Sequence, residues 1–266
     1  LSTDLMMGLP GQTVASFTAD LQRYIDMDVS VKAYPTQLLP NSPMAEPRYM
    51  AKYEIKTDEH SFLTSTYSYT PEDMQRMNAL YEVYVMADGY SLLRYILRYM
   101  QWEYNVSAGT FMANLLDDCQ RDPDSYPLLT WAVKYFNGDK SMPSGWANFY
   151  HEVQTYICAR YELTPSSGLA TVIAVSQAAM PDDALNYPYE VKLAHDFTAY
   201  YRQATNSPTD IERKPLESFP PASMTFTDPN KLSVLDLNSA QYDSHQYFWE
   251  LHSEVARPKS LAEFAG

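Results

Sequence analysis

Residues 4–13 read DLMMGLPGQT, and this string decides the fold of the start of the chain. Leu5 to Met7 form a short apolar run typical of a strand, and the GLPG string at residues 8–11 is a strong turn signal. Thr13 is a residue type that caps helices, and it precedes apolar residues at helical spacing: Val14, Phe17, Leu21 and Ile25. The string therefore predicts a strand, a tight turn and an amphipathic helix.

A second strand is predicted directly after this helix, from Val29 to Leu39. The two strands and the helix together make a β-turn-α-β unit, from which parallel sheets and β/α barrels are built. One such unit neither closes a barrel nor covers a sheet. We therefore expect it to need neighbouring strands that this sequence does not supply.

The rest of the chain is expected to be mostly helical. Residues 40–70 are predicted to be irregular, because Pro40, Pro43 and Pro47 interrupt them, and Thr70-Pro71 begins a capped helix that ends at Gly89. Further helices are predicted over 91–103, 108–119, 124–137, 145–162, 165–180, 190–204 and 239–256, with a small hairpin made by 223–226 and 232–237. The predicted organisation has four parts: the strand-helix-strand part at 1–45, a linker at 46–70, a helical domain at 71–205, and an extension at 206–266.

The composition narrows the class of protein. The 266 residues include only 8 glycines, beside 23 tyrosines and 13 methionines, which favours helices packed with large side chains. A net charge of −14 repels phosphate and anionic lipid, so nucleic acid and membranes are poor partners. No apolar run reaches the length of about 18 residues that spans a bilayer. The widely spaced Cys119 and Cys158 fit a reducing compartment, so we expect a cytoplasmic protein.

Familiar catalytic motifs are not found: there is no Walker A loop, no G-x-G-x-x-G and no G-x-S-x-G string. His151-Glu152 resembles the start of a zinc-protease helix, but Thr155 stands where the second histidine belongs. The His195-Asp196 pair and the His245/His252 pair could supply ligands or bases, although structural hydrogen bonding is the favoured interpretation. Arg94 and Arg98, one helical turn apart, could clamp an anion; pairing with nearby carboxylates at the surface is favoured.

Two strings carry a resemblance to a known family. The DLMMGLPGQT string, followed by Ser16-Phe17 and Asp20-Leu21, resembles a late barrel strand and turn of radical S-adenosylmethionine enzymes. The next string, KAYPTQLLPNSPM at residues 32–44, resembles the following strand of the subgroup with an N-terminal cobalamin-binding domain. Residues 65–70, 144–146 and 249–251 resemble, less specifically, the helical C-terminal extension of those proteins.

The resemblance implies a fold, cofactors and site residues. It implies an α/β remnant, the last β/α units of a partial TIM-type barrel, followed by a mostly α-helical C-terminal domain. The implied activity is S-adenosylmethionine-dependent radical methylation or rearrangement of an unactivated carbon, at a [4Fe-4S] cluster, with the use of cobalamin left open. Four turn residues would shape the cofactor end: Gly8, Gly11, Gln12 and Thr13. Four residues of the next strand are candidates to face a small-molecule substrate: Lys32, Tyr34, Thr36 and Gln37.

The chain also departs from the family. The Cys-x3-Cys-x2-Cys loop that holds the cluster is missing, and Cys119 and Cys158 do not replace it, because cluster ligation needs closely placed thiolates. We therefore expect this chain to hold no metal or cofactor by itself and to be inactive alone. The start at Leu1, inside a predicted strand and without Met, favours a truncated fragment. The two alternatives are that a partner chain supplies the front half and that the chain has lost the radical chemistry.

Two other functions stay open. The chain could be an acidic helical module without catalysis, which binds a partner protein and completes that protein's sheet with its β-α-β start. It could also be a helical protein that binds a small molecule in a tyrosine-lined pocket. The radical-enzyme fragment is the favoured hypothesis, because its string is long and ordered.

Overall fold

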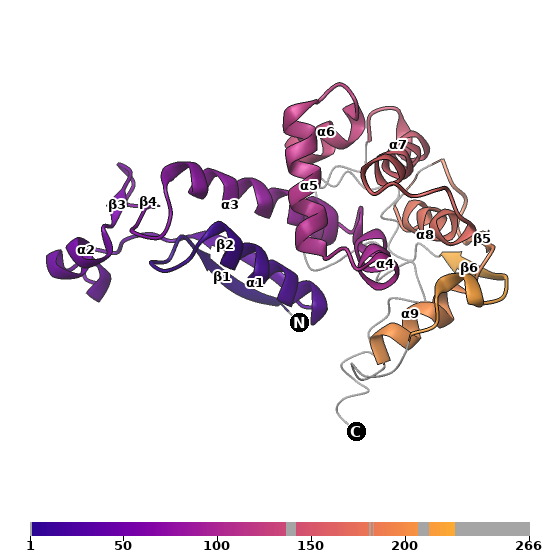
Figure 1. Ribbon diagram of the computed structural model, residues 1–266, viewed down its shortest axis with the longest axis horizontal. Coiled ribbons are helices and arrows are strands. Elements are labelled where there is room, and N and C mark those ends of the chain that lie inside the picture. Colours follow the sequence, from indigo (N-terminus) through magenta and orange to yellow (C-terminus); the bar gives the residue numbers. More distant parts are fainter. Residues whose placement is uncertain (1, 137–141, 181, 183, 207–212, 227–266) are drawn as a thin grey trace. The chain divides into compact units, whose positions relative to one another are not determined.

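The computed structural model describes residues 2–136, 142–180, 182, 184–206 and 213–226 (Figure 1). Its contacts divide the chain into two compact units. The first unit holds residues 1–85 and 107–117, and the second holds residues 86–106 and the chain from residue 118 onward.

The first unit begins with the predicted strand-helix-strand. Strand β1 (Ser2–Met7) and strand β2 (Ser30–Pro35) pair in parallel, with Ser2 opposite Ser30 and Met7 opposite Pro35, and α1 (Val14–Asp26) connects them. The predicted β-α-β arrangement of these three elements is therefore confirmed. β2 ends four residues before the predicted end, because the chain turns there to pair with another segment through the bridge between Gln37 and Phe62.

Helix α1 forms where the sequence predicts it. Thr13 is its N-cap, and Thr13 and Ser16 hydrogen-bond each other reciprocally, which satisfies two N–H groups at the helix start. Its buried residues lie at the predicted spacing: Phe17, Leu21 and Ile25. The helix lies along one face of the two strands (Figure 1), and the alternate strand residues Met7, Val31 and Ala33 are buried.

The prediction that residues 40–70 are irregular is wrong. They contain the 3-10 turn η1 (Pro43–Ala45), helix α2 (Pro47–Tyr53), and the antiparallel strands β3 (Lys56–Thr57) and β4 (Leu63–Ser65). Pro47 occupies the first helical turn of α2, where its fixed φ favours a helix, and Glu54 ends the helix in the left-handed conformation. Pro43 and Pro47 therefore mark the starts of short elements in this segment.

Helix α3 (Pro71–Tyr84) completes the first unit with α1 and the start of α5 (Ala108–Arg121). Thr70 and Asp73 form the capping box that begins α3. The Gly109 N–H, in the first turn of α5, donates to the Gln22 side chain of α1 at 2.9 Å. This bond ties α5 to α1 in a place where no side chain fits, because a Cβ on Gly109 would meet Thr18 at 2.9 Å.

The second unit is mostly helical, as predicted. It contains all but the first residue of the π-helical turn η2 (Val85–Gly89), and also α4 (Arg94–Tyr104), α6 (Pro127–Tyr135), α7 (Gly145–Arg160), α8 (Ser167–Ala178), α9 (Phe197–Asn206) and the 3-10 turn η3 (Leu216–Ser218). Helix α8 packs against α4 and α7. The expected tyrosine-rich core is present, since the fully buried side chains include Tyr95, Tyr150, Tyr156 and Tyr200.

One small sheet in this unit differs from the prediction. Residues 190–193, predicted as the start of a helix, belong to β5 (Tyr189–Leu193), which pairs antiparallel with β6 (Ala222–Phe226). Glu190 and Lys192 alternate with less exposed residues, which is strand periodicity. The strand predicted at 223–226 is thus confirmed with a different partner; residues 232–237 and 239–256 lie outside the described residues.

The fold class is therefore mostly helical, with three two-stranded sheets among the described residues. Those sheets do not close into a barrel, and the interpretation of residues 1–45 as a barrel remnant stays a proposal. In the described part of the chain, no helix is both long and apolar enough to cross a membrane.

Candidate functional site

The turn after β1 contains all four residues expected at the cofactor end. Gly8 and Gly11 have φ values of +88° and +97°, which glycine adopts readily and other residues rarely do. The Gln12 side chain closes the turn: its Oε1 accepts from the Gly8 N–H at 2.5 Å, and its Nε2 donates to the Met6 carbonyl at 3.3 Å. Gln12 therefore fixes the shape of the turn through its amide.

A distant segment braces the same turn. The Gly11 N–H donates to Ser68 Oγ at 2.9 Å, and the Tyr69 hydroxyl donates to the Gly8 carbonyl at 2.7 Å. Burial raises the pKa of Tyr69 to about 12, so this hydroxyl stays protonated as a donor at neutral pH. A Cβ on Gly8 would lie 2.9 Å from the Tyr69 oxygen. Gly8 is thus required both for its φ and for the approach of Tyr69.

Thr13 completes the turn at the start of α1. Its Oγ1 accepts from the Ser16 N–H at 3.1 Å, and its own N–H donates to Ser16 Oγ at 2.9 Å. The Gln12 N–H donates to the Leu9 carbonyl at 3.0 Å. The N–H groups of all four turn residues therefore already donate within the protein, and what the turn offers a ligand is its shape.

Two of the four substrate-facing candidates lie on an open face of the sheet. In the register, Lys32 is opposite Asp4 and Tyr34 is opposite Met6, so these four side chains share the face turned away from α1. Met6 is 42% exposed and Tyr34 is 47% exposed. Parallel sheets normally have both faces covered, but the described residues leave this face partly exposed.

The other two candidates lie beyond the end of β2 and have different surroundings. Thr36 is buried, and its hydroxyl donates to the Met7 carbonyl at 2.9 Å. The Gln37 amide donates to the His60 carbonyl at 3.0 Å. Both residues fasten the end of the strand, and the structure does not bring them onto the open face with Lys32 and Tyr34.

A buried charge cluster in the second unit contains both arginines that the sequence singled out. Arg94 Nη2 donates to Asp88 Oδ2 at 3.2 Å, and Arg98 Nη1 donates to Asp88 Oδ1 at 2.8 Å. The carboxylate partner confirms the expected pairing. The expected surface position is wrong, because these three side chains are only 3–6% exposed. The sequence carries little signal for Asp88, since it lies in the π-helical turn η2, outside any helical spacing with the arginines.

The electrostatics of this cluster are those of a structural ion triad. Burial by itself raises the pKa of Asp88, and the charges of Arg94 and Arg98 outweigh it, so the pKa lies below its ordinary value. The carboxylate is therefore ionised at neutral pH and supplies one negative charge between two buried guanidinium groups. It acts as their counter-ion and is a poor candidate for a general base.

His195 lies in a second cluster that the sequence pointed to. Its Nε2 is 2.8 Å from Ser167 Oγ, and its Nδ1 is 2.9 Å from the Phe219 carbonyl oxygen. A serine beside an oriented histidine could serve as a nucleophile. Glu217, however, accepts from the Gly168 N–H at 3.0 Å, and this hydrogen bond is the main reason that the pKa of Glu217 is lowered. A carboxylate thus occupies the start of α8, where an oxyanion would need its donors.

The residues of this chain do not fit an iron–sulfur cluster. The sequence has two cysteines, both free thiols in the second unit, and burial raises the pKa of each of them. Within the described residues, no group of three or more His, Cys, Asp or Glu side chains could hold a metal ion. His245 and His252 lie outside the described residues.

Comparison with known proteins adds no family to this description. A scan against protein-family models found no match, and a search of curated proteins found no significant relative.

Proposed function

We propose that residues 1–45 are the last β/α part of the barrel of a radical S-adenosylmethionine enzyme, of the subgroup with a cobalamin-binding domain. The helical remainder would be the C-terminal extension of that enzyme. The intact protein would methylate or rearrange an unactivated carbon of a small molecule by radical chemistry. The chain alone would be inactive, since its residues do not fit the cluster.

The open face of the β1–β2 sheet is the observation that carries this proposal. In a β/α barrel, helices cover the outside of the sheet and the opposite face lines the interior. Here α1 covers one face, while Lys32 and Tyr34 stand on the other. The braced turn at Gly8 and Gly11 lies at the carboxyl end of β1, where barrel enzymes place their sites.

These positions define a role for each candidate. The turn residues Gly8, Gly11, Gln12 and Thr13 would form a rigid rim that a cofactor packs against, because their N–H groups are already used. Lys32 and Tyr34 would contact the substrate, with the ammonium and the phenol as the polar groups. Thr36 and Gln37 would position the end of β2. Cluster, S-adenosylmethionine and any cobalamin would be held mainly by the rest of the barrel.

The coding sequence upstream of Leu1 is the first test. A Cys-x3-Cys-x2-Cys loop within further β/α units supports the proposal, and its absence from the upstream reading frame refutes it. If the loop is present, the intact protein is reconstituted with iron and sulfide under reducing conditions. The readouts are cleavage of S-adenosylmethionine and turnover of the substrate, measured separately.

Variants of the intact protein then test the open face. Lys32→Ala and Tyr34→Phe should lower substrate turnover while S-adenosylmethionine cleavage continues. Arg23→Ala is the control, because Arg23 is exposed on α1, which lies on the other side of the sheet. Equal effects of all three variants would contradict the role given to the open face.

The same face also favours a second candidate function, a protein-binding module without catalysis. Met6 and Tyr34 expose apolar surface, and β1 and β2 each have one strand neighbour in the described sheet. A partner strand could add to either edge. This candidate predicts self-association or capture of one partner protein that Met6→Lys abolishes, and a monomer at high concentration without such a partner would refute it.

A further inference from the structure

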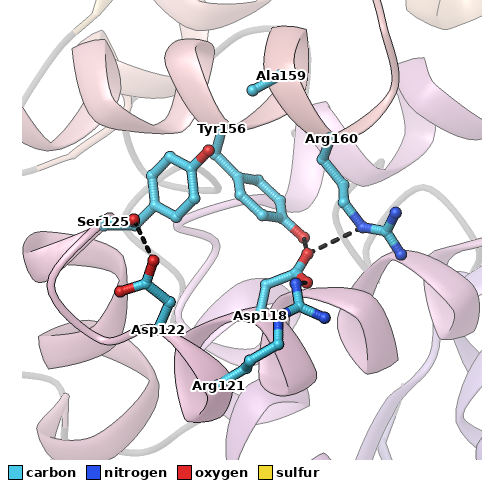
Figure 2. A pocket seen from close by; sticks show the side chains of 8 residues that line it. Asp118, Arg121, Asp122, Ser125, Tyr156, Ala159 and Arg160 are labelled. Carbon is cyan, nitrogen blue, oxygen red and sulfur yellow. Dashed lines mark hydrogen bonds and ion pairs between the residues drawn. The ribbon is translucent and has the colours of Figure 1, made fainter.

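A pocket of about 290 Å³ lies within the second unit. The end of α5, the connection that follows it and the last turn of α7 form its walls (Figure 2). Its lining residues are Asp118, Arg121, Asp122, Ser125, Tyr126, Tyr156, Ala159 and Arg160. The pocket has the mixed lining expected of a site for a small polar ligand, with charged groups beside aromatic rings.

Asp118 holds this pocket together. Its side chain is only 7% exposed, and its Oδ2 accepts from Arg160 Nε at 2.9 Å and from the Tyr156 hydroxyl at 3.1 Å. Its Oδ1 pairs with Arg121. One buried carboxylate therefore orients two guanidinium groups and a phenol before any ligand arrives, which lowers the entropy cost of binding.

Hydrogen-bonding groups remain available around the pocket. Arg160 uses its Nε, and its two Nη groups have no partner among the described residues. Asp122 accepts from Ser125 Oγ at 2.6 Å through Oδ2, which leaves Oδ1 available. The Tyr126 hydroxyl likewise makes no hydrogen bond within the described part of the chain, and its ring meets that of Tyr156 edge-on at 5.2 Å.

An acidic group and a basic group lie on opposite sides of the pocket. Figure 2 shows Asp122 and Ser125 on one side of the pocket and Arg160 on the other, with Asp118 and Arg121 between them. Two carboxylates and two guanidinium groups make the lining neutral as a whole, and the full chain carries −14. A simple anion gains little from such a site, because the rest of the protein repels it. A ligand that carries one positive and one negative group can pair with the acidic side and the basic side at once.

We propose that this pocket binds a free amino acid as a zwitterion. The ligand's carboxylate pairs with the Nη groups of Arg160, which present the planar fork suited to a carboxylate. Its ammonium group pairs with Asp122 Oδ1, and its side chain packs against the ring wall of Tyr126 and Tyr156. This proposal rests on the second unit alone and is independent of the function proposed for the open face.

The test is a titration of the full chain with a panel of the common amino acids, in which NMR or calorimetry measures binding. The tightest ligand is then compared with its N-acetyl derivative, which lacks the ammonium charge, and its amide, which lacks the carboxylate. Each charge-assisted hydrogen bond should contribute about tenfold to a hundredfold in affinity, so each derivative should bind more weakly by that factor. Inorganic phosphate serves as the simple-anion probe.

Two variants locate the ligand. Asp122→Asn should lower the affinity for the free amino acid at least about tenfold but leave the affinity for the N-acetyl derivative nearly unchanged. Arg160→Lys keeps a cation beside Asp118 but removes the planar pair of Nη groups. It should therefore lower the affinity for every ligand that carries a carboxylate. Arg76→Lys is the matched control, because Arg76 pairs with Asp117 in the first unit. Thermal melting verifies that each variant is folded.

Three results would overturn the proposal. One is that no amino acid binds at millimolar concentration. Another is that the free amino acid and its N-acetyl derivative bind equally. The third is that phosphate competes better than any amino acid, which would make the pocket a simple anion site.

Discussion

Asp88→Asn is expected to cause a large loss of stability in the second unit. The asparagine has nearly the shape of the aspartate, so packing is retained while one negative charge disappears. Arg94 and Arg98 then remain buried, with side chains only 4% and 6% exposed, without their shared counter-ion. Removing one member of a buried ion cluster is among the costlier changes in a folded protein, because the remaining buried charges lose its compensation.

The expected magnitude follows from this burial. Breaking a buried ion pair by removing one partner costs about 3–5 kcal/mol. For a domain of 150–250 residues, each kcal/mol lowers Tm by roughly 2–4 °C, so the melting temperature should fall by roughly 6–20 °C. Since folded proteins are stable by only about 5–15 kcal/mol, the second unit should lose a large share of its stability.

Tryptophan fluorescence during urea unfolding measures this loss in the correct unit. Trp102, Trp131 and Trp146 all belong to the second unit, and the first unit has no tryptophan. Arg121→Gln is the control, because Arg121 belongs to the same unit, its side chain is 73% exposed in its pair with Asp118, and its loss should cost less than about 1 kcal/mol. If Asp88→Asn also costs less than about 1 kcal/mol, the interpretation of the triad as a buried, charge-compensated cluster is wrong.

The dependence on pH gives the same prediction a second readout. The pKa of Asp88 is lower in the folded protein than its ordinary value, even though burial alone raises it, because Arg94 and Arg98 favour the charged form. Its contribution is complete above the unfolded carboxyl pKa of about 3.9 and is lost as the pH falls through the lower folded pKa. The advantage of the wild type over Asp88→Asn should therefore be constant from pH 7 to pH 5 and decrease only below about pH 4.

Three further substitutions have definite expected outcomes. Gly8→Ala combines a strained positive φ with a contact to Tyr69, so hydrogen exchange should show the first unit destabilised by roughly 1–2 kcal/mol or more; unchanged exchange would contradict the turn geometry. Thr13→Ala removes the cap of α1 and should cost the first unit about 0.5–2 kcal/mol by the same measurement, whereas Thr13→Ser should restore most of it. Glu217→Gln should destabilise the second unit by at most about 1 kcal/mol at pH 7, because the carboxylate is exposed to solvent, and a difference that persists below about pH 4 would exclude charge as its cause.

Features that depend on near neighbours in sequence could be predicted. The caps at Thr13 and Thr70 and the apolar spacing of α1 were sufficient to locate both helices, since capping and amphipathic packing act within a few residues. The parallel pairing of β1 and β2 followed from the β-α-β order. Lys32 and Tyr34 share a face because strand side chains alternate with a period of two residues.

Features that depend on distant contacts could not be predicted. The turn at Gly8 is braced by Tyr69, 61 residues further along the chain, and no local pattern announces that hydrogen bond. The strand period fails for Thr36 and Gln37 because β2 ends at Pro35, where the chain turns toward Phe62.

The braced turn changes what a ligand of this surface would meet. A strand-to-helix turn can bind an anion through free N–H groups, but here the N–H groups of Gly8, Gly11, Gln12 and Thr13 already donate within the protein. Chemical recognition on this unit therefore falls to the open face, where Lys32 and Tyr34 hold the polar groups and Met6 adds apolar surface. Covering Met6 and Tyr34 is favourable because it buries apolar surface, whereas Asp4 and Lys32 on the same face need polar partners when they leave water. Both proposals therefore remove this face from solvent: in the barrel it lines an interior that encloses a small molecule, and in the partner-binding module it is covered by another protein.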